Sequence, residues 1–211
     1  EADPSAMKLT AKLNKKQTAA TLTLTGNQGA AKVSYKVINR EGGKKIRKSY
    51  AAELQDDGDW LAQVKIADFK KAGEYEVIAY SKNYYGTEKK VATGTFTVDG
   101  PSAGIVNVRK INLNKGTFRL RLKDVMSASK VKNVQVTIKN LEGKKKTKAY
   151  TAKKNGSYYD VPVSMKDFGY ALGKYRFTVT VTDGNGITKE VKKVVYEFEK
   201  KDPKITAKLK S

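Results

Sequence analysis

Residues 57–69 read DGDWLAQVKIADF and residues 72–77 read AGEYEV, and a second copy follows as NGSYYDVPVSMKDF at 155–168 and LGKYRF at 172–177. The glycines and tyrosines of the two shorter pieces lie 100 positions apart: Gly73 and Gly173, Tyr75 and Tyr175. An internal repeat of this length predicts two tandem domains rather than one. We place the repeats at residues 8–98 and 105–200.

The residues around each copy alternate between apolar and polar types, as strands with one buried face do. In the first repeat the alternation is clearest at 20–25 and 33–37, and in the second at 118–122 and 134–138. Turn residues punctuate the chain every 8–12 positions, and no helical period exceeds one turn. The pattern predicts an all-β fold class, with two tandem immunoglobulin-like antiparallel β-sandwiches.

Glycine and proline mark the ends of the repeats. The segment DGPSAG at 99–104 predicts a linker. At the other end, KITAKL at 204–209 nearly repeats KLTAKL at 8–13, and each follows an Asp-Pro pair. Residues 201–211 are therefore predicted to be the start of a third, truncated repeat, in a monomer belonging to a longer multidomain chain.

The composition argues against most catalytic chemistry. The chain has no cysteine and no histidine, which removes thiol chemistry, the commonest metal ligand and the commonest general base. No pair of acidic residues recurs in both copies at a cleft-like position. We therefore expect a protein that is not an enzyme, with no catalytic residues, no cofactor and no metal site.

The net charge of +22 is unevenly distributed. Residues 1–98 carry 17 Lys and Arg against 11 Asp and Glu, whereas residues 99–211 carry 26 against 10. Such a field favours a polyanionic partner. Lysine supplies most of it, which favours diffuse attraction over the bidentate recognition that arginine provides. No apolar run reaches the length of a transmembrane segment, and Glu1–Met7 has no apolar signal region.

A set of turn and strand motifs occurs in both copies: a Val-x-Val strand, a glycine turn, a tyrosine return strand, Asp/Asn-Gly-x-aromatic and Gly-x-Tyr. In the first copy these are Val33–Val37, Gly42, Tyr50, Asp57–Trp60 and Gly73–Val77. The second set is Val134–Ile138, Gly143, Tyr150, Asn155–Tyr158 and Gly173–Phe177. The set resembles the Bsp-like (group B streptococcal secreted protein-like) repeats of Gram-positive cell-surface proteins. The resemblance implies a secreted, cell wall-associated module without catalytic residues, commonly placed beside peptidoglycan hydrolase domains.

Two basic hairpins are the first candidate binding sites. They follow the glycine turns at equivalent places in the two repeats, and their candidate polyanion-binding residues are Lys44, Lys45, Arg47, Lys48, Lys144, Lys145, Lys146 and Lys148. Basic loops on a regular array favour contact with a polyanion. Lysine on an exposed strand edge also serves to prevent aggregation, so this simpler role stays open.

Exposed aromatic residues are the second candidate, as a stacking platform for sugar rings: Trp60, Tyr84, Tyr85 and Tyr158. Aromatic residues on half-buried strands also pair across a sheet or enter the core. Asp56, Asp57 and Asp59 flank Gly58 and have calcium-ligand chemistry, although Asp-Gly is also a common turn pair. No motif for specific nucleic-acid recognition is present.

The sequence therefore favours a non-catalytic extracellular spacer that binds cell-wall polymers, either teichoic acid or peptidoglycan, by loose electrostatic attraction. Tandem copies would add avidity. Two alternatives stay open: a carbohydrate-binding or adhesion module that uses the exposed aromatics, and a structural stalk without a ligand.

Overall fold

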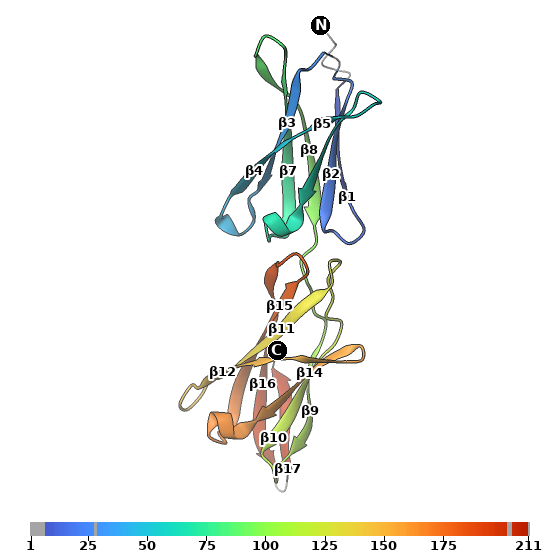
Figure 1. Cartoon of the computed structure of the whole chain (residues 1–211). Coiled ribbons are helices and arrows are strands. Elements are labelled where there is room, and N and C mark those ends of the chain that lie inside the picture. Colours follow the sequence, from blue (N-terminus) through green and yellow to red (C-terminus); the bar gives the residue numbers. More distant parts are fainter. Residues whose placement is uncertain (1–6, 28, 202–203, 211) are drawn as a thin grey trace. The chain divides into compact units, whose positions relative to one another are not determined.

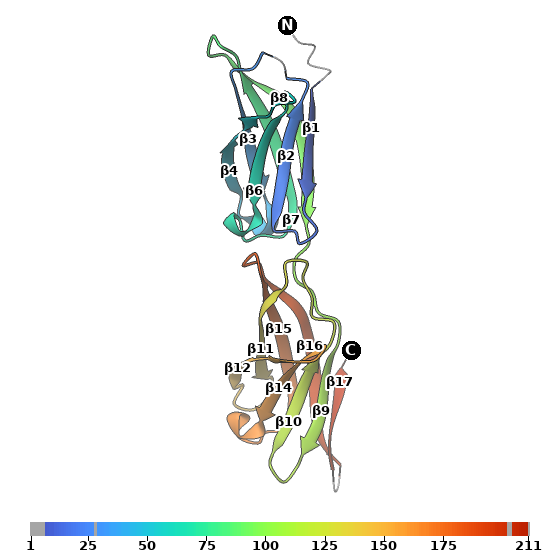
Figure 2. The same ribbon diagram turned by 45° about the vertical axis from the view of Figure 1, so that its right-hand side comes forward.

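The computed structural model describes residues 7–27, 29–201 and 204–210. The chain divides into two compact units between Gly100 and Pro101, and residues 184–187 group with the first unit. Each unit is an antiparallel sandwich of two sheets (Figures 1 and 2). The predicted fold class is confirmed.

In the first unit, one sheet has the strand order β1-β2-β6-β5 and the other β4-β3-β7-β8. The strands are β1 Lys8–Leu13, β2 Ala19–Thr25, β3 Lys32–Asn39, β4 Ile46–Ala51, β5 Glu53–Leu54, β6 Trp60–Lys65, β7 Gly73–Lys82 and β8 Glu88–Val98. The crossover between β6 and β7 begins as a single 3-10 turn, Ile66–Asp68.

The second unit repeats this arrangement with sheets β13-β14-β10-β9 and β12-β11-β15-β16-β17. Its strands are β9 Val106–Asn112, β10 Thr117–Leu122, β11 Val131–Asn140, β12 Thr147–Thr151, β13 Lys153–Asn155, β14 Tyr158–Ser164, β15 Gly173–Asp183, β16 Thr188–Lys201 and β17 Lys204–Lys210. A 3-10 turn, Met165–Phe168, occupies the same crossover.

The core of each unit is formed by the inward residues of the alternating strands. Leu22, Val37 and Val77 are completely buried in the first unit, as are Leu120 and Val179 in the second. Phe69 and Phe168 from the two crossovers cap the cores, each with its ring edge against a buried tyrosine, at centroid distances of 5.1 and 5.2 Å. The apolar positions of the alternating segments are thus the ones that face the core.

Those two tyrosines, Tyr75 and Tyr175, form the corner that is typical of immunoglobulin-like sandwiches. Tyr75 donates its hydroxyl to the carbonyl of Lys71 at 2.5 Å, and Tyr175 donates to the carbonyl of Ala171 at 2.6 Å. Burial raises the pKa of both phenols, so that they stay protonated donors. The repeated Gly-x-Tyr motif is therefore a structural signature.

The glycine of each motif is required by its backbone and by a close neighbour. Gly73 and Gly173 have φ values of 93° and 100°, in the region that favours glycine. A Cβ atom at either position would lie 2.2 or 2.1 Å from the side chain of Glu41 or Glu142, respectively. The first residue of β7 and of β15 therefore has to be glycine.

The predicted linker 99–104 is shorter in the structure. Asp99 is tied to the first unit by two hydrogen bonds of 2.7 Å with the side chain of Gln17. Ser102 exchanges backbone hydrogen bonds with Met126, and Gly104 donates to Lys123, so both belong to the second unit. The predicted strand at 204–209 is β17, which pairs with β16. That it opens a third repeat stays a prediction; residues 201–203 and 211 of that segment are not fully described.

Candidate polyanion-binding surfaces

The two basic hairpins connect equivalent strands, β3 to β4 and β11 to β12. The side chains of Lys44, Lys45, Lys144, Lys145 and Lys146 are all exposed. Within the described residues none of these five ammonium groups has a carboxylate within ion-pair distance. They are therefore free to meet a soluble or polymeric anion.

Lys148, by contrast, is already engaged. Its ammonium lies 2.7 Å from a carboxylate oxygen of Asp167, which also accepts a 2.7 Å hydrogen bond from the hydroxyl of Tyr150. The hydrogen bond from Lys148 is the main reason that the pKa of Asp167 is lowered. Lys148 is therefore better explained as part of a local network than as a free contact for a polymer. In the first unit, Lys48 lies over the ring of Phe69 at 5.9 Å.

The outer sheet face next to the hairpin is acidic in the first unit and basic in the second. On β7, Glu74 and Glu76 point outward, and the equivalent residues of β15 are Lys174 and Arg176. Ile38, opposite Glu76, is replaced by Lys139 opposite Arg176. The two hairpins therefore have similar charge, but only the second one adjoins a basic face.

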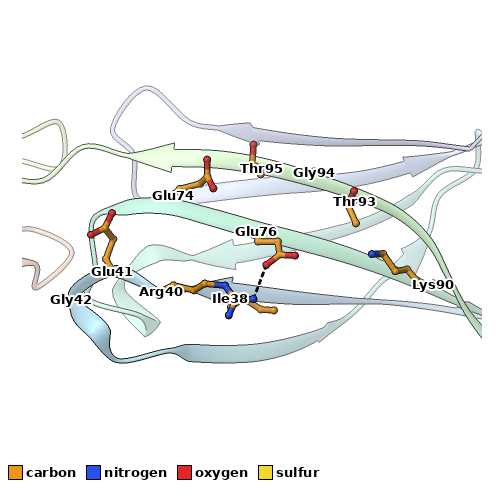
Figure 3. Close-up of a pocket in the computed structure, with 10 residues that line it drawn as sticks. All are labelled: Ile38, Arg40, Glu41, Gly42, Glu74, Glu76, Lys90, Thr93, Gly94 and Thr95. Carbon is orange, nitrogen blue, oxygen red and sulfur yellow. Dashed lines mark hydrogen bonds and ion pairs between the residues drawn. The ribbon is translucent and has the colours of Figure 1, made fainter.

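In the first unit this face forms a polar groove of about 690 Å³. It is lined by residues of β3, β7 and β8 and the turn after β3: Ile38, Arg40, Glu41, Gly42, Glu74, Glu76, Lys90, Thr93, Gly94 and Thr95 (Figure 3). Arg40 pairs with Glu76 at 3.2 Å, drawn dashed in Figure 3. The remaining carboxylates oppose a polyanion, so this groove does not suit the predicted partner.

The predicted aromatic platform is not assembled. Trp60 is only 8% exposed and lies in the core, so its ring face is not accessible to a sugar; this candidate was wrong. Tyr84 and Tyr85 are 81% and 95% exposed at the β7–β8 turn. Tyr158 is half-buried, and its ring contacts Arg121 at 4.6 Å and Lys123 at 5.6 Å. The strand pairing also makes Tyr159, not Tyr158, the counterpart of Trp60, because each is opposite the second residue of a short strand.

The acidic segment 56–59 is a turn. Asp57 accepts a hydrogen bond from the amide of Asp59 at 3.0 Å, and Gln55 and Asp59 close the turn through their backbones. Across residues 7–27, 29–201 and 204–210, no group of three or more acidic side chains is placed to hold a metal ion. The turn interpretation accounts for these residues.

One charged cluster was not singled out from the sequence. Arg121 on β10 donates hydrogen bonds of 2.8 and 2.9 Å to both carboxylate oxygens of Asp160 on β14. Asn155 donates a third at 2.8 Å, and Arg119 lies 3.9 Å away. The hydrogen bond from Arg121 is the largest cause that lowers the pKa of Asp160 to about 2. The signal available in the sequence was the outward alternation of Arg119 and Arg121.

No family model and no curated protein matches the sequence. Among solved structures, the chain is similar to a polysaccharide deacetylase from Bacillus cereus, with 17% identity and a TM-score of 0.39 over 46% of this chain and 31% of that one. It is also similar to a tetra-tandem repeat in the extending region of a large adhesion protein, with 17% identity and a TM-score of 0.35 over 97% and 49% of the two chains. A Ca²⁺-stabilised adhesin of an Antarctic bacterium gives 19% identity and a TM-score of 0.32 over 92% and 48%.

The chain thus spans less than half the length of each of these three structures. In the part of the chain that the structure describes, no helix has the length and apolar character needed to cross a lipid bilayer.

Proposed function

We propose that the chain is a non-catalytic, extracellular module of two tandem immunoglobulin-like units, related to Bsp-like repeats, that binds anionic cell-wall polymers by electrostatic attraction. It acts as a spacer that keeps a neighbouring catalytic or adhesive domain close to the wall. The main observation in favour is a group of six basic residues on adjoining parts of the second unit. We call it the hairpin surface, and its residues are Lys139, Lys144, Lys145, Lys146, Lys174 and Arg176.

The backbone joins the two parts of the hairpin surface. Leu141, at the start of the hairpin, donates a hydrogen bond of 2.8 Å to the carbonyl of Lys174. Lys139 and Arg176 are directly opposite each other on β11 and β15. Like charges in this position destabilise a sheet slightly, and a bound polyanion would remove that repulsion.

A matched pair of variants tests the proposal on purified cell wall. The triple variant Lys144→Gln/Lys145→Gln/Lys146→Gln should reduce binding by roughly tenfold or more, since each cation near an anionic surface contributes about 1 kcal/mol. The equivalent variant of the first unit, Lys44→Gln/Lys45→Gln/Arg47→Gln, removes the same charge beside an acidic face and should have a smaller effect. Equal losses of binding in the two variants would mean that only the net charge of the chain matters. If not even the wild type bound the wall, the chain would be a structural stalk without a ligand.

The exposure of Tyr84 and Tyr85 supports a second candidate, contact with a carbohydrate through one turn of the first unit. The equivalent turn of the second unit reads Asp183-Gly184-Asn185-Gly186 and carries no aromatic residue. The variant Tyr84→Ala/Tyr85→Ala should leave electrostatic binding intact. If it abolished wall binding while the lysine variants did not, the carbohydrate function would replace the one proposed.

A further inference from the structure

A second basic surface lies on the other sheet of the second unit. Arg109 on β9 and Arg119 and Arg121 on β10 belong to its outer face, whereas Val106, Leu120 and Leu122 of the same two strands point into the core. These are three of only six arginines in a chain with 43 basic residues. Most of the positive charge of the chain comes from lysine, yet half of its arginines, the residues that can bind an anion in a bidentate manner, lie on this one sheet face.

Two of these arginines share a single carboxylate, that of Asp160. Asp160 accepts two hydrogen bonds from Arg121 and one from Asn155, and its ion pair with Arg119 is longer, at 3.9 Å. Arg109 has no ion pair with any residue that the structure describes. Arg109 is therefore uncompensated and Arg119 only partly compensated, so the face keeps net positive charge.

These two arginines are held directly opposite each other. Arg109 pairs with Arg119 in the β9–β10 ladder, a position that brings the two Cβ atoms to about 5 Å in antiparallel sheets. Two like charges there repel each other, and an anion between them converts the repulsion into two attractions. The spacing of Arg109 and Arg119 therefore suits a single anionic group bound between them.

A β-bulge adds a third cation. The β9–β10 register shifts between Thr117 and Arg119, where Lys110 adopts a φ of 50°. Bulges redirect side chains, and here both Arg109 and Lys110 are exposed. Lys110 and Arg119 line a hollow of about 300 Å³ with Pro162 and Ser164. The hollow is open along β14 because β13 pairs only as far as Asp160.

The first unit provides an internal comparison. In its equivalent sheet, β1 and β2 pair without a register shift, and Lys12 is opposite Thr21 where Arg109 is opposite Arg119. Thr23 and Leu61 occupy the positions of Arg121 and Asp160. The fold does not need the arginines, the bulge or the carboxylate, so these features call for an explanation particular to the second unit.

We propose that Arg109, Lys110 and Arg119 form a discrete binding site for the phosphate group of a phosphodiester-linked polyol chain. The neighbouring Arg121–Asp160 ion pair supports Arg119. Planar guanidinium groups bind phosphate oxygens in a bidentate manner that lysine cannot reproduce. The inference rests on the proposed function, because it identifies a second contact for the same class of polymer.

The same face argues against a nucleic acid as the occupant. Binding of single strands relies on aromatic side chains on which bases stack. The ring of Tyr158, next to the arginines, already contacts Arg121 and Lys123. Phe118 lines the hollow but is 3% exposed and packs in the core, so neither ring is free to stack on a base. A polymer with phosphates and no bases fits the site better.

The experiment measures the affinity of the whole chain for poly(glycerol phosphate) by calorimetry. Arg109→Gln/Arg119→Gln should weaken binding on the order of tenfold or more, because two charge-assisted contacts are lost. The control Lys12→Gln/Lys65→Gln removes two charges from the equivalent face of the first unit and should weaken it far less. Arg119→Lys keeps the charge but not the bidentate geometry, and should also lose affinity. Melting curves confirm that each variant is folded.

The possible outcomes separate the two proposals. If wild type does not bind poly(glycerol phosphate), the proposed function fails. If wild type binds and the lysine hairpin variant of the second unit weakens it, but Arg109→Gln/Arg119→Gln matches its control, the arginine site is refuted while the proposed function stands. An Arg119→Lys variant as tight as wild type would also refute the bidentate site. Tighter binding of a single-stranded oligonucleotide than of poly(glycerol phosphate) would refute the polyol occupant.

Discussion

The guanidinium of Arg121 and the carboxylate of Asp160 form a bidentate ion pair across β10 and β14, with donor–acceptor distances of 2.8 and 2.9 Å. The side chains are 16% and 9% exposed, so both charges are largely withdrawn from water. The first unit has Thr23 and Leu61 in the same two places. One fold thus tolerates either a polar–apolar pair or a buried ion pair at this site.

Removing only one member of this pair should be costly. Arg121→Thr leaves Asp160 without its main partner and should lower the free energy of unfolding of the second unit. Arg121→Thr/Asp160→Leu, which reproduces the residues of the first unit, should recover most of that loss. Chemical denaturation followed by circular dichroism measures it, while the fluorescence of Trp60 reports the first unit separately. A double variant no more stable than the single one would contradict this explanation.

The second unit should lose stability in acid because of Asp160. Its pKa is lowered to about 2 by the hydrogen bond from Arg121, compared with about 3.9 for an unfolded aspartate. The ionised carboxylate therefore contributes its full stabilisation above about pH 4, and this is lost as the pH falls towards 2. Unfolding curves between pH 2 and 5 should show a loss of about 2 kcal/mol in wild type that is absent in Asp160→Asn. Parallel pH profiles would show that other groups cause the acid sensitivity.

The two tyrosine corners should contribute similar stability. Tyr75→Phe and Tyr175→Phe each delete a buried hydroxyl and leave a backbone carbonyl without its donor, at a cost of about 1–2 kcal/mol in the affected unit. Tyr84→Phe removes a hydroxyl from a side chain that is 81% exposed and should change nothing. Thermal denaturation of the three variants tests this, and an effect of Tyr84→Phe equal to the others would contradict it.

The glycines before the corners should not tolerate a side chain. Gly173→Ala requires alanine at a φ of 100° and places its Cβ 2.1 Å from an oxygen of Glu142, which should cost more than about 1 kcal/mol. Adding Glu142→Ala should recover the steric part but not the backbone part. Gly94→Ala, whose Cβ would meet Leu9 at an ordinary 3.5 Å, is the control for denaturation measurements. Equal effects at both glycines would contradict the backbone argument.

The strands and core could be predicted from sequence because alternation is local. The alternation at 118–122 predicts that Phe118, Leu120 and Leu122 face inward and that Arg119 and Arg121 face outward, and the structure confirms all five positions. Trp60 was misjudged because the sequence WLAQVK does not show which face of the strand is buried: the structure puts Trp60, Ala62 and Val64 inward.

The charged clusters could not be predicted because they depend on the pairing of distant strands. Arg121 and Asp160 are 39 positions apart, and only the β10–β14 register places them opposite each other. Likewise, the engagement of Lys148 by Asp167 depends on how the crossover folds against β12. The net charge predicted a basic surface, but not which cations would remain free.

The most direct test of the central claim is the affinity of the intact chain for poly(glycerol phosphate) as a function of salt concentration. Electrostatic binding to a polyanion predicts that the logarithm of the association constant falls linearly with the logarithm of salt, by roughly tenfold or more between about 50 and 300 mM. Binding that is absent at low salt, or constant across the whole series, would contradict the claim that this module holds a phosphate polymer by its charge.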